Sequence, residues 1–519
     1  MPVISFRYGL VACLILTVTS VAEFIAAESP LVDAARQGEW ERVTVLLDEG
    51  VDVTLSQGDG STALHWAAYW NEEDSAARLL RAGADVNATT DLGVTALWSA
   101  CENGSAEMAR RLLAAGADPN AKLLSGESLL MTAARSGSAG VVRQLLVAGA
   151  DVEVSAARGQ TALMWAVAQQ HADVVEALLA HGANVESRSD VWTEVVKTSP
   201  DPWSPEYVME RQQGGYTPLL FAARVGDLAS AELLVEAGAN VDDTAPYGTS
   251  ATVVAAHSGH GDVATFLLEQ GADPDTAGAG YTALHAAILH KDAGLVRALL
   301  ANGADPNYPV ERATPIRRDA IDFYIDPSYV GSTPFWLAAR FGVPEIMYQL
   351  AELGANPLAM HHPTYWPGSL GVTEDRRIIE EGPTTALMAA AGLGGRPPLV
   401  AVDRLDRIAE SAPVRSTRRE PNTVEQERAT LRAATLAVEL GIDVNVANAD
   451  GDTALHAVAR RGYNSVVEYL VAHGAQIDVK NRAGLTALDV ARSASGRDQN
   501  NPVAQQSTVD LLRRLGASE

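Results

Sequence analysis

Side chains able to act as metal ligands, bases or nucleophiles are sparse in this sequence. It contains 11 His and 2 Cys in 519 residues, and the cysteines are Cys13 and Cys101. Two cysteines cannot build a cysteine zinc site or a disulfide framework. The adjacent histidines at 361 and 362 have poor spacing for metal ligands, and no carboxylate partner accompanies them in sequence. We therefore expect no metal site.

Catalytic motifs are also missing from the sequence. It has no Gly-x-x-x-x-Gly-Lys, no Gly-x-Ser-x-Gly and no His-Glu-x-x-His, which are the local signatures of phosphate loops, nucleophilic serines and zinc hydrolases. Cys101 lies in a predicted helix, where a thiol acts as a small core residue rather than a nucleophile. We expect no catalytic residue and no cofactor, so the protein should not be an enzyme.

The net charge of the chain bears on whether its partner is a nucleic acid. Lys and Arg number 39 against 65 Asp and Glu, which gives a formal net charge of −26. A chain this acidic repels the phosphates of nucleic acids. We therefore expect no nucleic acid partner.

The first 27 residues resemble a targeting segment. Arg7 is the one charge before an apolar run from Leu10 to Ala22, and small residues follow. This order is typical of a secretory signal peptide, with cleavage after Ala22 or after Ala27. The run has 13 residues, short of the ~20 that span a bilayer, although an uncleaved membrane anchor is the alternative. We expect export to the periplasm or beyond, with no membrane attachment after removal.

The rest of the sequence is periodic. A Thr or Ser followed by a small residue and usually Leu recurs, first at intervals of 33 residues. These anchors are Ser29, Thr62, Thr95, Ser128, Thr161, Thr217, Ser250, Thr282, Thr333, Thr385, Thr453 and Thr486. A Gly lies 21 residues after most of them. Two markers in one register indicate a repeat architecture of twelve units.

Each unit has the features of a helical hairpin. The anchor hydroxyl can cap a first helix, as Thr62 would. A second helix carries paired leucines such as Leu79 and Leu80 and ends at Gly83, since Gly adopts the left-handed conformation without steric penalty. The Asp and Asn that follow favour a projecting turn, or finger. One unit is therefore two helices and a finger.

These motifs resemble the ankyrin repeat. Thr-Ala-Leu-His-x-Ala occurs at residues 62–67, 282–287 and 453–458, and Leu-Leu-x-x-Gly-Ala-Asp-x-Asn at 79–87, 112–120 and 299–307. The resemblance implies an all-α solenoid of about twelve hairpins with first helices on the concave side. In chain order we expect a signal peptide at 1–27, repeats 1–5 at 28–187, an insertion at 188–213, repeats 6–8 at 214–307, an insertion at 308–330, repeat 9 at 331–358, an insertion at 359–382, repeat 10 at 383–448 with an insertion at 395–430 between its helices, and repeats 11–12 with a C-terminal cap at 449–519.

Three of the insertions replace fingers and are rich in aromatic residues. Either these rings only pack the insertions against the solenoid, or they form a binding surface, since Trp, Tyr and Arg are common interface anchors. The second hypothesis predicts one partner-binding site over repeats 6–10. Its rim would be formed by Trp192, Trp203, Tyr324, Tyr329, Tyr365 and Trp366, and its floor by Phe221, Arg224, His257, His290 and Arg340. A further group of large rings, Trp66, Tyr69 and Trp70, occupies the concave side of repeat 2.

The sequence thus predicts an exported, non-enzymatic scaffold that binds a protein partner through its concave face and long fingers. The alternative is an enzyme or small-ligand binder whose pocket the finger insertions close. An open groove would favour the scaffold, and a pocket burying polar groups from several insertions would favour the alternative.

Overall fold

The computed structural model describes residues 29–197, 208–246, 248–313, 325, 327–365, 379–380, 382–394, 423–494 and 502–518. The chain forms two compact units. The first runs to Val191 and also holds Gly214–Ala222 and Ala229–Ala239, while the second holds Trp192–Gln213, Ala223–Leu228 and the chain from Asn240 onward. The expected signal peptide at 1–27 lies outside the described residues.

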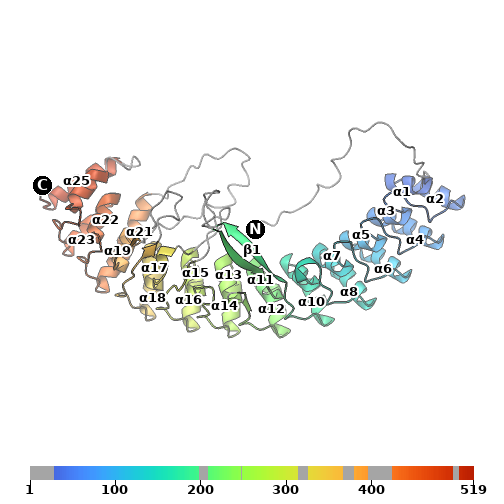
Figure 1. Ribbon diagram of the computed structural model, residues 1–519, viewed down its shortest axis with the longest axis horizontal. Coiled ribbons are helices and arrows are strands. Elements are labelled where there is room, and N and C mark those ends of the chain that lie inside the picture. Colours follow the sequence, from blue (N-terminus) through green and yellow to red (C-terminus); the bar gives the residue numbers. More distant parts are fainter. Residues whose placement is uncertain are drawn as a thin grey trace. The chain divides into compact units, whose positions relative to one another are not determined.

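The first unit contains five helical hairpins in two layers (Figure 1). Its first helices are α1 (Pro30–Gln37), α3 (Ala63–Tyr69), α5 (Ala96–Glu102), α7 (Leu129–Ser136) and α9 (Ala162–Ala168). Its second helices are α2 (Trp40–Asp48), α4 (Glu73–Arg81), α6 (Ala106–Ala114), α8 (Ala139–Val147) and α10 (Ala172–Ala180). Each first helix packs against the next first helix, and each second helix against the next second helix. The 3-10 turn η1 (Ala157–Gly159) lies before α9.

The predicted caps and stops are present. The hydroxyl of Thr95 accepts a hydrogen bond from the backbone N–H of Trp98 at 3.1 Å, which satisfies one free donor of the first turn. Beyond the second helices, Gly83 and Gly116 have φ of 96° and 93°, where a Cβ would be strained. Alanines such as Ala67 and Ala100 are fully buried, so neighbouring first helices approach closely.

The second unit continues the same pattern. Its first helices are α13 (Ala251–Ser258), α15 (Ala283–His290), α17 (Pro334–Arg340), α19 (Ala386–Ala391), α22 (Ala454–Arg461) and α24 (Ala487–Ala494). Its second helices are α14 (Gly261–Glu269), α16 (Ala293–Ala301), α18 (Pro344–Glu352), α21 (Thr423–Glu439), α23 (Asn464–Ala472) and α25 (Pro502–Arg514). The pair α11 (Pro218–Val225) and α12 (Leu228–Glu236) has residues in both units. The predicted all-α solenoid is confirmed, with twelve hairpins in the described chain.

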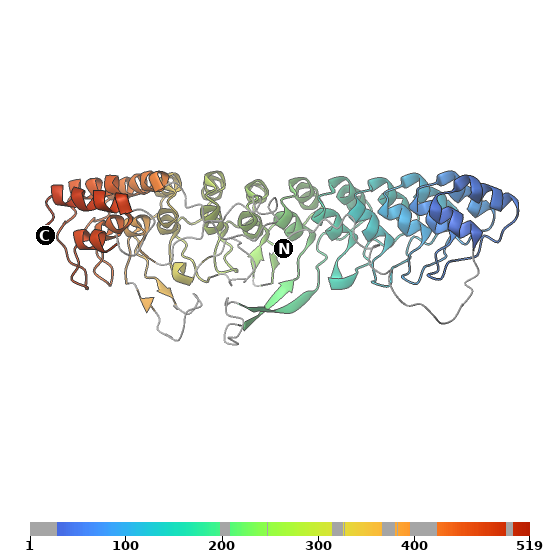
Figure 2. The same cartoon turned by 90° about the horizontal axis from the view of Figure 1, so that it is seen from above.

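Short strands were not predicted, and they occur where the chain turns back at the fingers. The two-stranded sheets are β1 (Val191–Lys197) with β2 (Val208–Gly214), β3 (Thr244–Ala245) with β4 (Thr249–Ser250), and β5 (Thr364–Tyr365) with β6 (Ile379–Glu380). Pairing satisfies backbone groups that an irregular loop would leave to water. Figure 2 shows the β5–β6 ribbon extending from the edge of the second unit where its turns lie.

None of the helices in the described ranges is long and apolar enough to cross a membrane.

Candidate functional site

The base of the first insertion is fixed by hydrogen bonds within the first unit. The backbone N–H of Ser189 donates to the Tyr216 carbonyl oxygen, and the N–H of Tyr216 donates to the Ser189 hydroxyl, each at 3.0 Å. The Arg188 guanidinium donates to the Gly215 carbonyl at 3.1 Å. The two ends of the insertion therefore leave and re-enter the solenoid side by side.

Beyond this neck the insertion forms the strands β1 and β2. Along β1, Val191 and Val195 are 52% and 60% exposed, whereas Trp192 is half-buried. The side chains of a strand alternate between its two faces, so one face of β1 presents β-branched residues to solvent. Trp203, predicted at the rim, lies outside the described residues.

The predicted floor residues are held by their neighbours. Phe221 is half-buried and makes an edge-on contact with Tyr216, with ring centroids 5.7 Å apart. Arg224 is exposed at the end of α11.

His257 and His290 are brought together in the second unit. The ring Nε2–H of His290 donates to the His257 carbonyl oxygen at 2.8 Å, and His257 Nδ1 lies 3.2 Å from the Tyr281 hydroxyl. Burial lowers the pKa of His290 below its usual value. Both imidazoles therefore join consecutive repeats, which is a structural role.

The position of Tyr329 differs from the one we predicted. We expected it at the rim of a binding surface, but it is 2% exposed. It lies in the 3-10 turn η3 (Pro327–Tyr329) and packs against Trp336 and Phe341, with centroid separations of 6.2 and 5.8 Å. Arg340, expected on an open floor, is also buried, at 6% exposed. For these two residues, packing explains the side chain better than binding.

His361 occupies the same buried region. Its ring Nε2–H donates to the Ser328 carbonyl oxygen at 2.7 Å, and its backbone pairs with that of Thr384. The ring lies edge-on to Trp336, with centroids 4.3 Å apart. Burial lowers the pKa of His361 to about 4, so the ring is neutral at pH 7. The second and third insertions are thus joined to each other and to α17 through this histidine.

The remaining rim residues are placed only in part. Tyr365 lies in β5, and its backbone pairs with Ile379 of β6. Tyr324 and Trp366 lie outside the described residues. The predicted rim of Trp192, Trp203, Tyr324, Tyr365 and Trp366 therefore stays a prediction.

The histidine of the Thr-Ala-Leu-His motif links neighbouring repeats, as His65 illustrates. His65 Nδ1 accepts from the Thr62 backbone N–H at 3.1 Å, and its Nε2–H donates to the Val94 carbonyl of the next finger at 2.9 Å. Cys101 is fully buried as predicted, and burial raises the pKa of its thiol. Among the described residues, no three or more His, Cys, Asp or Glu gather as metal ligands would.

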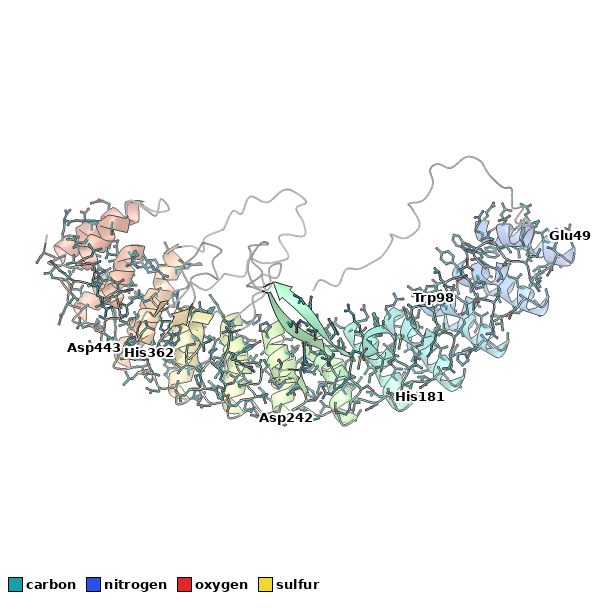
Figure 3. The ribbon with its side chains drawn as sticks, in the orientation of Figure 1. Glu49, Trp98, His181, Asp242, His362 and Asp443 are labelled. Atoms are coloured by element: carbon teal, nitrogen blue, oxygen red, sulfur yellow. The ribbon has the colours of Figure 1, made fainter. Side chains whose placement is uncertain are left out.

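Repeat 2 carries large aromatic side chains that are exposed to solvent. Tyr69 and Trp70 are 56% and 51% exposed at the end of α3. The rings of Trp66 and Tyr69, and of Tyr69 and Trp70, meet edge-on at 5.7 and 5.4 Å. The Trp70 indole N–H donates to the Arg36 carbonyl at 3.3 Å, which fixes that ring. We call Trp66, Tyr69 and Trp70 the aromatic face. This face lies in the layer of first helices, which also contains Trp98, labelled in Figure 3.

A cavity between α6 and α8 was missed by sequence reasoning. It has a volume of about 320 Å³ and is lined mainly by apolar atoms. The available signal was Val147, an apolar residue at a repeat position that is otherwise small or charged.

A family comparison decides the identity of the fold. A model described as ankyrin repeats (3 copies) matches residues 31–123, 97–189, 219–310 and 427–505, more than half of the chain. The chain belongs to the ankyrin-repeat family. Ankyrin repeats form scaffolds for protein–protein interaction, and the family is generally non-enzymatic.

Several curated relatives share this repeat region. The chain is 27% identical over 308 residues to E3 ubiquitin-protein ligase KEG of Arabidopsis thaliana, covering 53% of this chain and 18% of that protein. It is 43% identical over 95 residues to a putative ankyrin repeat-containing protein of Treponema pallidum, covering 17% and 31%. It is 30% identical over 145 residues to human Rabankyrin-5, covering 27% and 12%. The chain thus spans less than a third of each relative.

Proposed function

We propose that this chain is an exported, non-enzymatic scaffold that binds a protein partner through the face of its first helices and its finger insertions. Export is supported by the leader-like sequence at residues 1–27, with cleavage after Ala22 or Ala27. Periplasm or extracellular space would then be its location.

The aromatic face is the observation that carries the proposal. Tyr69 and Trp70 leave half of their surface in water, although burying a large ring is worth roughly 2 kcal/mol or more. Neither ring is needed to fill the core, because close packing of the first helices relies on alanines such as Ala67 and Ala68. Large rigid rings with a fixed orientation lose little entropy on binding, which makes them effective interface anchors.

The β1–β2 ribbon provides the second proposed contact. Its neck is fixed at Ser189, and Val191 and Val195 are exposed on one face together with Thr193. The predicted rim residues of the insertions would extend this contact. Buried Tyr329 and Arg340 would support the insertions from beneath rather than touch the partner.

The test begins with capture of partners from the exported fraction by the purified mature protein. Calorimetry with the identified partner then compares wild type with the Tyr69→Ala/Trp70→Ala double variant, which should weaken binding at least tenfold. Tyr348→Ala is the matched control, because Tyr348 is 53% exposed on the second helix α18. Equal affinity of wild type and double variant would remove the aromatic face from the site. N-terminal sequencing of the native protein tests export, which an intact Met1 would contradict.

A further inference from the structure

The groove between α6 and α8 is a second exposed apolar surface, on the side of the second helices. These helices lie next to each other in the first unit (Figure 1). The cavity of about 320 Å³ is lined by Arg110, Leu113, Arg143, Gln144, Val147 and Ala148. Val147 is 82% exposed, so its side chain contributes almost nothing to the core of the solenoid.

Val147 is unusual for its position in the repeat. It stands two residues before the Gly that follows its second helix. The equivalent residues of the other repeats are Asp48, Arg81, Ala114, Ala180, Glu236, Glu269, Ala301, Glu352, Glu439, Ala472 and Arg514. All of these are charged or are alanine, as a solvent-exposed helix end favours. The fold therefore does not require a branched apolar residue here.

One polar atom beside the groove has no hydrogen-bond partner among the described residues. The side-chain oxygen of Gln144, which lines the cavity, is buried and accepts no hydrogen bond from the described chain. An unsatisfied buried acceptor costs about 1–3 kcal/mol. This oxygen is closed off from solvent, so a donor lying in the groove would reach it only after the Gln144 side chain turned outward.

The charge around the groove has the opposite sign to its surroundings. Residues 29–191 carry 22 Asp and Glu against 11 Lys and Arg, whereas α6 and α8 together carry three Arg and one Glu. That Glu107 is shared by Arg110 and Arg111, at 2.7 and 2.9 Å. Arg143 is exposed and makes no ion pair with another described residue. Arg111 also pairs with Glu73 of α4 at 3.5 Å, so the groove has an apolar floor and one basic edge, at Arg143.

We propose that this groove binds an amphipathic α-helix of a second protein, with acidic residues beside its apolar stripe. Side chains of a third helix can pack into the groove between two parallel helices at an axis distance of roughly 8–10 Å. Leu113 and Val147 would contact the apolar stripe, and Arg143 would pair with the flanking carboxylates, since Arg110 is already held by Glu107. This inference does not rest on the proposed function, because it uses the second helices instead of the first.

A matched pair of peptides tests the proposal directly. Both are fluorescein-labelled 18-residue helices with one leucine stripe that contains a single Gln, and their flanks carry either Glu or Lys. Fluorescence anisotropy with the full mature protein should give at least tenfold tighter binding of the Glu-flanked peptide. Equal binding of the two peptides, or no binding of either, would overturn the proposal.

Val147→Glu should weaken the Glu-flanked peptide at least tenfold, because it places a carboxylate in the groove within reach of Arg143. The fold should tolerate this change, since Glu236 and Glu269 hold the same position in other repeats. Ala301→Glu is the control at the equivalent position of repeat 8 and should leave binding unchanged. Unaltered binding by Val147→Glu would refute the assignment.

Two further variants separate this surface from others. Arg143→Glu alters an exposed residue and should shift the preference toward the Lys-flanked peptide, which a purely apolar contact would not do. The Tyr69→Ala/Trp70→Ala double variant should bind the Glu-flanked peptide as wild type does. Loss of peptide binding in that double variant would place the peptide on the aromatic face and overturn the groove.

Discussion

Residues 29–187 and residues 240–394 are built from the same hairpin, yet a pair of large rings in the first is exposed and a pair in the second is buried. In the first region fingers are short, and the large rings Tyr69 and Trp70 are half exposed. In the second region Tyr329, at the end of the second insertion, and Trp336, in α17 beside it, are 2% and 1% exposed. A long insertion must bury its own apolar groups to be ordered. Aromatic residues near the base of an insertion therefore indicate packing before they indicate binding.

Fingers that carry an amide and fingers that carry a carboxylate hold their neighbours differently, and both kinds occur in each region, for example Asn307 in the second and Glu153 in the first. Asn120 donates its side-chain N–H to the Gly149 carbonyl and accepts from the Asp151 backbone N–H. Asp242, at the equivalent position, accepts from the Asp273 N–H at 2.8 Å but has no N–H to donate. The amide links neighbouring repeats in both directions, and the carboxylate links them in one.

The largest expected effect tests the contrast between buried and exposed rings. Tyr329→Ala should lower the free energy of unfolding by about 3–5 kcal/mol, because it leaves a cavity beside Trp336 and Phe341. Tyr69→Ala, which removes an exposed ring of the same type, should cost below about 1 kcal/mol. Urea unfolding followed by circular dichroism measures both. Similar losses for the two variants would erase the distinction between the regions.

Acid should weaken the second region more than the first. Burial lowers the pKa of His285 and His361 to about 4, against about 6.5 in the unfolded chain. The stability that depends on these neutral rings is complete above pH about 6.5 and is lost as the pH falls toward 4. At pH 4 each buried imidazole should cost about 3 kcal/mol.

Hydrogen exchange by mass spectrometry, corrected for intrinsic rates, reports each region at pH 7 and pH 4.5. Protection should fall more in α15 and α17 than in α5 to α9. His361→Asn keeps a polar side chain that does not titrate, and it should reduce the acid-induced loss around α17. An equal loss of protection in both regions would contradict the assignment to these histidines.

The regular parts of the fold were predictable because each unit repeats its local signals. Capping hydroxyls, small residues within the first helices and a terminal Gly recur at fixed positions. The helix boundaries of a unit with a weak signal can therefore be predicted from the register of the other units. The burial of Cys101 followed from the same register.

The insertions were less predictable because nothing in them repeats. The composition of the insertions showed that they are rich in aromatic residues, but it could not show which of these residues face inward. Tyr329 is buried because η3 places it against α17, a contact that depends on three-dimensional packing. The groove at Val147 was missed for another reason: comparing one position across all repeats would have revealed it.

A smaller effect is expected at the core position that Cys101 occupies in the regular region. Equivalent positions hold alanine in both regions, for example Ala134 and Ala256. Cys101→Ala should therefore keep the fold and cost about 1 kcal/mol through the lost sulfur contacts. A thiol reagent should label native wild type slowly, since the side chain is 0% exposed and burial raises its pKa. Rapid labelling would show that α5 opens readily and that the regular region is less rigid than its packing indicates.

The smallest expected effect comes from exchanging the two kinds of finger. Asn120→Asp removes the donor to the Gly149 carbonyl and should cost about 0.5–1 kcal/mol. Asp242→Asn makes the reverse change in the second unit and should add a bond to the Gly271 carbonyl. It also removes one carboxylate from an acidic edge where burial and the neighbouring Asp305 and Asp273 raise the pKa of Asp275.

Asp242→Asn should accordingly stabilise the protein by a similar amount, about 0.5–1 kcal/mol. Part of this gain should shrink at high salt, because repulsion between exposed carboxylates is screened over about 10 Å at 0.1 M. Urea unfolding at low and high salt separates the hydrogen bond, which salt leaves intact, from the charge effect. If Asp242→Asn destabilised the protein while Asn120→Asp did not, the carboxylate would be the better link between repeats. The contrast drawn between amide and carboxylate fingers would then have to be reversed.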